Sequence, residues 1–292
     1  MQLTPNPRYG YSALPDRPQF DWPGGARLAV YLGVNIECFS FGEGLGAELA
    51  PGGPQPDVLN YAWRDYGNRV GLWRMLELFE RLELPCTALV NSDIYDVAPG
   101  LAEAFAARGD EIAGHGRTNA ERQGLLDEAG ERALINQATT VLSDRSGQAP
   151  KGWLGPWISQ SAVTPDLLHE AGYEYLLDWC HDDQPTWMQT RKGRILSVPY
   201  PQELNDIPQI VGRKREGAEF GDMIIDAFDV MLEESQRRPL VMGIALHGYL
   251  MGQPHRLRHL ARALEHMLRT GGDRVWWTTA GAINDHYRAL DL

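Results

Sequence analysis

The stretch RLAVYLGVNIE, residues 27–37, decides the fold. Its almost unbroken apolar run from Leu28 to Val34 is typical of a strand that is buried on both faces, as strands of parallel sheets are. Two polar residues, Asn35 and Glu37, follow at the carboxyl end of this strand. The stretch therefore predicts the first strand of a parallel sheet, with side chains for chemistry where the strand ends.

Strand-like and helix-like segments alternate along the rest of the chain, which predicts an α/β fold. Further strands are predicted at 86–91, 111–116, 151–157, 173–179, 194–200, 240–248 and 274–279. Helices are predicted at 66–82, 100–110, 127–145, 164–172, 221–236 and 254–270, followed by a terminal helix. Thr164 is expected as the N-cap of its helix. The long irregular segments 38–60 and 201–218 are expected to form lids or substrate loops.

Polar or aromatic residues stand at the carboxyl ends of five of these strands. They are Asn35 and Glu37, His115, Trp157, Asp178 and His247. Active sites of α/β barrels are built at that end of the strands, which favours a barrel over an open sheet. A single polar strand end would be ordinary, but five are less so. The barrel is expected to span residues 27–292 as one catalytic domain.

Composition excludes some classes of partner. The chain has 27 basic and 39 acidic residues, a formal charge of −12, which argues against nucleic acid and anionic membranes because both favour basic patches. The three cysteines do not form a disulfide framework. No apolar run approaches the roughly 18 residues of a membrane span. A cytoplasmic protein is expected, with residues 1–26 as an arm that packs on the body or on a neighbouring subunit.

Five motifs carry a resemblance to a known family: NIE (35–37), HGRTN (115–119), GPW (155–157), DWCHDDQP (178–185) and ALHGYLMGQP (245–254). Together the chain resembles the polysaccharide deacetylase family, carbohydrate esterase family four, in the branch that contains the metal-independent allantoinase. The resemblance implies a distorted, incomplete (β/α) barrel. It also implies a homo-oligomer, commonly a tetramer, that acts on a small-molecule substrate.

Typical members of the family use an aspartate base and a metal held by a carboxylate and two histidines. By resemblance, Asn35 stands at the base, Glu37 at the carboxylate ligand, His115 at the first histidine and Asn119 at the second. An asparagine amide is a poor base and a poor zinc ligand. We therefore expect no cofactor. If zinc or another divalent cation is bound, its ligands would be Glu37, His115 and Asn119.

Amide hydrolysis without a metal requires a base and donors for the oxyanion. Glu37 is the expected base if burial raises its pKa, and its alternative role is that of a buried structural carboxylate. His115 and His247 can transfer protons or donate to the oxyanion. Asn35 and Asn119 offer amide N–H donors.

The candidate substrate-binding residues each have a second interpretation. Arg117 would bind an acidic or ureido group, or else point to solvent. Trp157 and Trp179 would stack on a planar ring, or else pack in the core. By resemblance Asp178 would orient a catalytic group, although GPW lacks the usual arginine partner. Asp182 would contact substrate, or else belong to a solvated loop.

The sequence thus predicts a hydrolase of carbon–nitrogen bonds other than peptide bonds that opens a small cyclic amide, ureide or imide. The allantoinase pattern has bulky residues after the His-Gly pair, whereas this chain has Arg117, Thr118 and Asn119. Allantoin itself is therefore not the expected substrate. The alternatives are a metal-dependent de-N-acetylase of an amino sugar or polysaccharide, and a non-catalytic binding protein.

Overall fold

The computed structural model describes residues 3–50, 52–290 and 292. In this part of the chain nine strands form one curved sheet in the order β6-β7-β5-β4-β3-β2-β1-β8, and β9 pairs with β1 outside this path. The strands are β1 (Leu28–Ile36), β2 (Thr87–Val90), β3 (Glu111–Gly114), β4 (Gly152–Trp153), β5 (Tyr175–Leu176), β6 (Thr186–Thr190), β7 (Gly193–Ser197), β8 (Leu240–His247) and β9 (Val275–Thr278). The sheet curls without closing, which confirms the predicted incomplete barrel.

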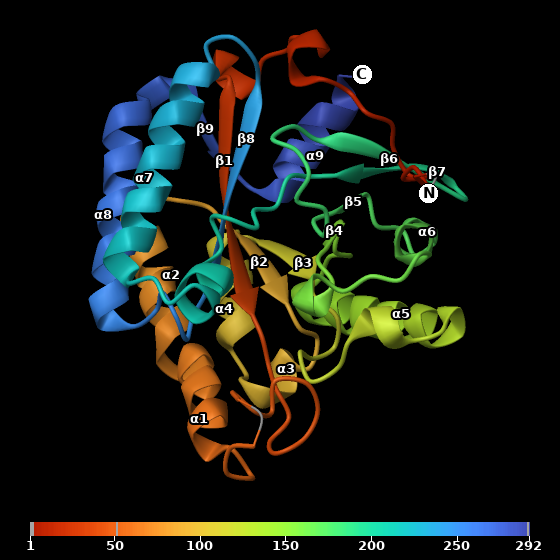
Figure 1. Cartoon of the computed structure of the whole chain (residues 1–292), viewed down its shortest axis with the longest axis vertical. Coiled ribbons are helices and arrows are strands. Elements are labelled where there is room, and N and C mark those ends of the chain that lie inside the picture. Colours follow the sequence, from red (N-terminus) through yellow and green to blue (C-terminus); the bar gives the residue numbers. More distant parts are fainter. Residues whose placement is uncertain (1–2, 51, 291) are drawn as a thin grey trace.

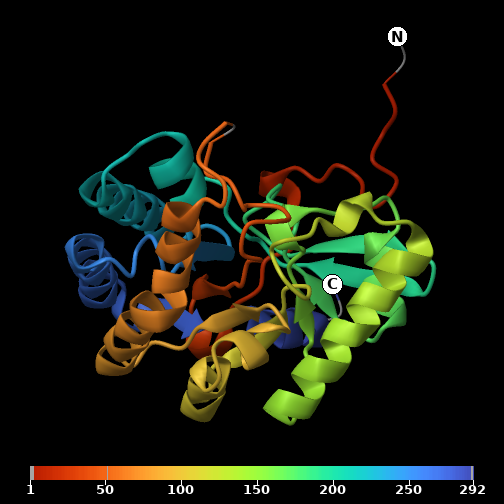
Figure 2. The ribbon, with the colours of Figure 1, turned by 90° about the horizontal axis from the view of Figure 1, so that it is seen from below.

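The helices surround the sheet: most cover its outer face, whereas α9 packs with the inner side of β1 (Figures 1 and 2). They are α1 (Val58–Tyr66), α2 (Leu72–Arg81), α3 (Ile94–Val97), α4 (Leu101–Arg108), α5 (Glu128–Ser146), α6 (Thr164–Glu170), α7 (Gly217–Glu234), α8 (Pro254–Gly271) and α9 (Ala280–Ala289). Figure 1 shows α7 and α8 lying side by side along β1 and β8. Their apolar faces bury one side of the sheet, which is the main stabilising term in such a fold.

The twofold period of the strands decides which side chains enter the barrel. Along β1 the even positions from Leu28 to Ile36 pack against the helices, whereas Ala29 and Tyr31 pack on the inner side. The same alternation sends Asn35 to the inner side. Asn35 is level with His247 of β8 and with Leu89 of β2, so the polar ends of neighbouring strands meet.

The predicted segments differ from the structure in their ends. The helix predicted at 66–82 begins earlier: α1 continues through a π-helical turn at 67–71 into α2. The strands predicted at 151–157 and 173–179 shrink to β4 and β5, of two residues each. Strand β6, which pairs antiparallel with β7, was not predicted from the sequence. The reason is that Thr186–Thr190 is only half buried and lacks a long apolar run.

The cap predicted for α6 is wrong by one residue. Val163 is the N-cap and Thr164 is the first helical residue. The Thr164 hydroxyl instead accepts a hydrogen bond from the backbone N–H of Ser161 at 2.8 Å and donates to the buried Glu131. The Thr164 hydroxyl does not cap the helix because it is hydrogen-bonded to the buried carboxylate of Glu131.

The N-terminal segment lies against the body of the same chain. Trp22 is buried and its indole N–H donates to the Leu240 carbonyl at 3.0 Å, while Arg8 pairs with Asp166 at 2.7 Å. Among the described residues, no helix is both long enough and apolar enough to cross a lipid bilayer. The cytoplasmic location and the homo-oligomer remain predictions.

Candidate active site

A cavity of about 200 Å³ opens where the central strands end. The alternation of side chains along the strands places four residues in its wall: Asn35 near the end of β1, Glu37 just after β1, His115 just after β3 and His247 at the end of β8. The structure therefore brings these four predicted residues together with Asn119 and Trp157. The remaining lining residues are Arg64, Leu154, Ile158, Tyr200, Gln202, Asn205, Ile207 and Pro208.

Glu37 lies at the centre of the cluster. One carboxylate oxygen, Oε1, accepts a hydrogen bond from the side-chain amide of Asn119 at 2.6 Å. The Nε2 atoms of His115 and His247 lie 3.4 and 3.5 Å from the same oxygen. The other oxygen, Oε2, is buried and has no hydrogen-bond partner in the described part of the chain. A buried carboxylate oxygen without a partner is unusual and is typical of functional sites.

His247 is held by a carboxylate that the sequence reading missed. Its Nδ1 lies 2.6 Å from Asp206 Oδ1, and its backbone N–H donates to Asp206 Oδ2 at 2.8 Å. Burial alone would lower the pKa of His247, but the Asp206 and Glu37 carboxylates raise it to about 10. His247 is therefore an imidazolium at neutral pH, with its Nε2–H facing Glu37.

The expectation of a raised pKa for Glu37 is wrong. The side chain is buried as expected, and burial by itself would raise its pKa. The positive charge of His247 and hydrogen bonds from both histidines outweigh burial and hold the pKa of Glu37 well below its usual range. Glu37 is therefore a carboxylate, because an adjacent cation stabilises the charged form.

The His115 ring is oriented by the backbone. Its Nδ1 lies 2.8 Å from the Leu154 carbonyl oxygen, which can only accept, so Nδ1 carries a proton. Its Nε2 therefore faces Glu37 and the cavity. On the opposite side, the Asn35 amide donates to the Tyr200 hydroxyl at 3.1 Å and to the Leu246 carbonyl at 3.2 Å.

The direction of the Asn119 amide follows from a chain of hydrogen bonds. The Asn91 Oδ1 accepts from the backbone N–H of Cys38 at 2.9 Å, so its Nδ2 must point the other way. That Nδ2 donates to the His115 carbonyl and to Asn119 Oδ1, the latter at 3.1 Å. Asn119 therefore presents its NH₂ group, and not its oxygen, to Glu37. Asn91 was missed, although it ends the strand predicted at 86–91 with inward parity.

The orientation of the Asn119 amide decides whether these residues can bind the divalent cation that the family resemblance implies. A cation needs lone pairs from its ligands, but the Asn119 position offers N–H groups to the carboxylate. Within the described residues there is no group of three or more His, Cys, Asp or Glu arranged to hold a metal. The donor set of Glu37, His115 and Asn119 does not fit a zinc site.

A tight turn carries Trp157 to the rim of the cavity. Trp157 and Ile158 have φ angles of 62° and 51°, in the left-handed region that non-glycine residues rarely adopt. The turn is held because the Trp157 indole N–H donates to the Asn119 carbonyl at 2.8 Å, and Gly155 N–H donates to Asp178 Oδ1 at 2.8 Å. Asp178 thus acts on the turn and does not line the cavity.

Three predicted substrate-binding residues lie outside the cavity. Arg117 pairs with Glu121 at 2.6 Å and with Gln137, four and twenty residues along the chain, and so turns toward the surface. Trp179 donates to Gln160 at 2.9 Å and packs edge-on against Tyr9. Both side chains lie outside the cavity for the same reason: each is hydrogen-bonded to a residue outside the cavity.

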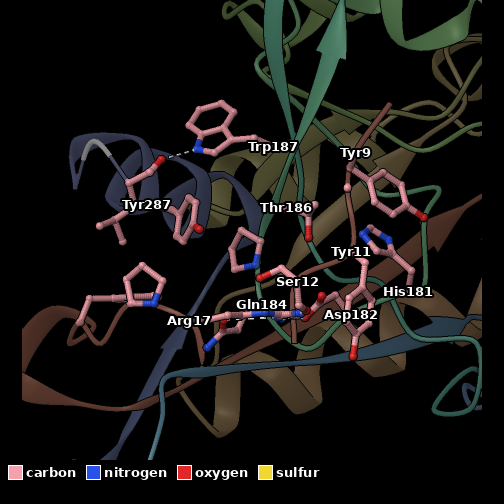
Figure 3. Close-up of a pocket in the computed structure, with 15 residues that line it drawn as sticks. Tyr9, Tyr11, Ser12, Arg17, His181, Asp182, Gln184, Thr186, Trp187 and Tyr287 are labelled. Atoms are coloured by element: carbon pink, nitrogen blue, oxygen red, sulfur yellow. Dashed lines mark hydrogen bonds and ion pairs between the residues drawn. The ribbon is translucent and has the colours of Figure 1, made fainter. Parts of the chain in front are cut away.

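Asp182 lies in a different pocket, which Figure 3 shows between the N-terminal segment and β6. It pairs with Arg17 at 2.5 Å and accepts from the backbone N–H of Gln184 at 2.9 Å. Asp182 therefore ties the N-terminal segment to its loop, and the structure separates it from Glu37.

The incomplete barrel is the fold of deacetylase-type proteins, and an amide-rich polar cluster lies at its open end. The family model for polysaccharide deacetylase matches residues 60–176. A Schizosaccharomyces pombe protein with the provisional name polysaccharide deacetylase is 27% identical, and the match covers 92% of each chain.

Two solved structures are similar over nearly the whole length. PuuE allantoinase is 29% identical with a TM-score of 0.83, and the match covers 94% of each chain. A Pseudomonas aeruginosa PAO1 protein, also provisionally named a polysaccharide deacetylase, is 29% identical with a TM-score of 0.83, covering 95% of this chain and 98% of that one.

These matches confirm the predicted resemblance to the deacetylase family and its allantoinase branch. They also confirm the predicted enzyme class, that of hydrolases acting on carbon–nitrogen bonds other than peptide bonds.

Proposed function

We propose that this protein opens the ring of a small cyclic amide, ureide or imide by hydrolysis of a carbon–nitrogen bond, without a catalytic metal. One observation carries the proposal: Asn119 points its side-chain N–H at Glu37, where a metal-dependent deacetylase would need a ligand lone pair. The likeness to PuuE allantoinase, named for a cyclic ureide, supports it.

The size of the cavity supports a small substrate. Its volume of about 200 Å³ is below the roughly 300–1,000 Å³ of pockets for drug-sized ligands. Leu154, Ile158 and Pro208 give it apolar walls, and Trp157 stands at its rim. A flat ring with a few polar atoms matches such a lining better than a hydrated polymer chain does.

The residues of the cavity can perform each step of the hydrolysis. Glu37 Oε2 takes a proton from water while the water oxygen bonds to the carbonyl carbon, and the carbonyl electron pair moves onto its oxygen. The N–H groups of His247 and Asn119 stabilise the resulting oxyanion. The carbon–nitrogen bond then breaks, and the ring nitrogen takes the bonding pair together with a proton from His247.

The low pKa of Glu37 is compatible with this role. The His247 cation lowers that pKa, so loss of the His247 proton to the leaving nitrogen makes Glu37 more basic as the reaction proceeds. The proton taken from water then returns from Glu37 to His247. Asp206 keeps the imidazole in place throughout.

The test is an assay of the purified protein against ring amides, imides and ureides, and against N-acetylglucosamine oligomers, each with and without excess chelator. We expect turnover of at least one ring substrate, unaffected by the chelator. Release of acetate from the oligomers alone, abolished by the chelator, would overturn the proposal in favour of a metal-dependent deacetylase.

A further inference from the structure

Arg64 is a charged residue of the cavity wall that the route above does not use. It lies in the last turn of α1, and its side chain lines the cavity together with Glu37 and His247. In the described part of the chain, no carboxylate lies within ion-pair distance of its guanidinium. The acidic groups of the cluster are already engaged, because Asp206 and Glu37 both contact His247.

The guanidinium is fixed before any ligand arrives. Its Cζ lies 4.0 Å from the centre of the Phe39 ring, which is cation–π distance, and 5.8 Å from the Trp157 ring. Its Nε donates to Asn60 Oδ1 at 3.1 Å. The Asn60 amide in turn donates to the Gly46 carbonyl at 2.7 Å, so the side chain that holds Arg64 is itself fixed.

These contacts leave the terminal edge of the guanidinium, which carries Nη1 and Nη2, free for a ligand. Among the described residues, Nη1 and Nη2 have no hydrogen-bond partner, while Nε is engaged. Two parallel N–H groups in a planar fork match the two oxygens of a carboxylate. A half-buried cation without a counter-ion, in a cavity with apolar walls, favours an anionic ligand because little water remains to screen the charge.

We propose that Arg64 is a substrate-binding residue that pairs with a carboxylate on the ring substrate, away from the bond that is cleaved. The preferred substrates are then cyclic amides or ureides that carry a carboxylate, rather than neutral rings. This inference rests on the proposed ring hydrolysis and adds the charge of the substrate to it.

Matched probes separate the charge from the ring: hydantoin, which is neutral, and hydantoin-5-acetic acid, which adds a carboxylate. The variants are Arg64→Met, which keeps the stem on Phe39, and Arg64→Lys, which keeps the charge without the fork. Arg81→Met is the control, because Arg81 lies at the end of α2, pairs with Glu265 and is exposed.

Turnover and binding are measured in parallel. Binding is followed by calorimetry on proteins that also carry Glu37→Gln, so that no turnover interferes. We expect wild type to prefer hydantoin-5-acetic acid. Arg64→Met should weaken its binding and raise its KM by about 10- to 100-fold, the scale of a charge-assisted hydrogen bond, and should change values for hydantoin less than twofold. Arg64→Lys should lie between, and Arg81→Met should match wild type.

Equal losses for both probes in Arg64→Met would overturn the inference and indicate a packing role. A lower melting temperature with unchanged discrimination would do the same, as would the failure of hydantoin-5-acetic acid to bind wild type. If the carboxylate probe binds through Arg64 but neither ring is opened, the binding inference holds and the proposed hydrolysis fails. The two failures are therefore distinguishable.

Discussion

The Nδ1 atom of His247 lies 2.6 Å from Oδ1 of Asp206, although the two residues are 41 positions apart in the chain. Asp206 is fully buried, and a second bond from the His247 backbone N–H fixes its carboxylate. This pair determines the orientation and the charge of the histidine that faces Glu37.

Replacement of Asp206 by Asn should remove the charge that keeps His247 protonated. Turnover should fall by about 100-fold or more, because general-acid action depends on that proton. Activity of the wild type should decline as pH rises toward about 10, the pKa of His247. In the variant this basic limb should move to lower pH, since the carboxylate that raises the pKa is gone. A pH profile of kcat measures it, and an unshifted limb would refute the assignment.

Replacement of Glu37 by Gln should lower kcat by about 10²- to 10⁴-fold, the usual scale for loss of a general base. Gln is nearly isosteric, so the protein should still fold. Circular dichroism and active-site-independent melting curves should be measured on the same preparation. Glu121→Gln is the matched control, because Glu121 pairs with Arg117 outside the cavity. A lower melting temperature with normal turnover per folded molecule would assign Glu37 a structural role.

Replacement of Asn119 by His should increase zinc affinity without improving ring hydrolysis. The change supplies a ligand nitrogen but removes the N–H group that contacts Glu37 at 2.6 Å. Metal content measured by mass spectrometry should rise in the variant, while turnover should fall. The wild type should keep its activity in excess chelator. Stoichiometric zinc in the wild type, with activity lost on its removal, would contradict the metal-independent proposal.

Asp178 should make stability depend on pH. Burial raises the pKa of this carboxyl to about 7, against partial compensation by the hydrogen bond from the Gly155 N–H. Because the folded-state pKa lies above the unfolded value of 3.8, the folded protein loses stability as pH rises from about 4 to about 7. The loss is on the order of 4 kcal/mol at most, at 1.36 kcal/mol per pKa unit.

Asp178→Asn should remove this dependence, since Asn does not titrate and its Oδ1 can still accept from Gly155. Denaturant midpoints of the two proteins should be close at pH 4. The variant should become progressively more stable than the wild type up to pH 7 and keep a constant advantage above it. A difference that does not change with pH would show that Asp178 does not titrate in this window.

Several features of the site were predictable because they depend on local periodicity. Inward parity along the strands placed Asn35 and Glu37 from β1, His115 after β3 and His247 at the end of β8 around one cavity. The same parity could have identified Asn91, at the end of its strand. The two short strands β4 and β5 were overestimated, because apolar runs continue into turns that are buried without being extended.

Local sequence patterns predicted Arg117 in the cavity, but the structure places Arg64 there instead. Arg117 follows the His-Gly motif and was expected in the site, but it pairs instead with Glu121, four residues further along the same loop. Arg64 stands in a helix with no motif around it, and only the packing of that helix against Phe39 brings its guanidinium to the cavity. The direction of a long side chain depends on partners that its own segment does not specify.

The sequence by itself determined the alternation of strands and helices, the strand ends that carry chemistry, and the loss of a base carboxylate and a ligand histidine at Asn35 and Asn119. Tertiary structure alone decided the electrostatics. Asp206 reaches His247 from a loop without periodicity, Asn91 turns the Asn119 amide toward Glu37, and the resulting cation lowers a pKa that burial would have raised. Charges and hydrogen bonds act through space over a few ångströms, so their balance is fixed only when distant segments have packed together.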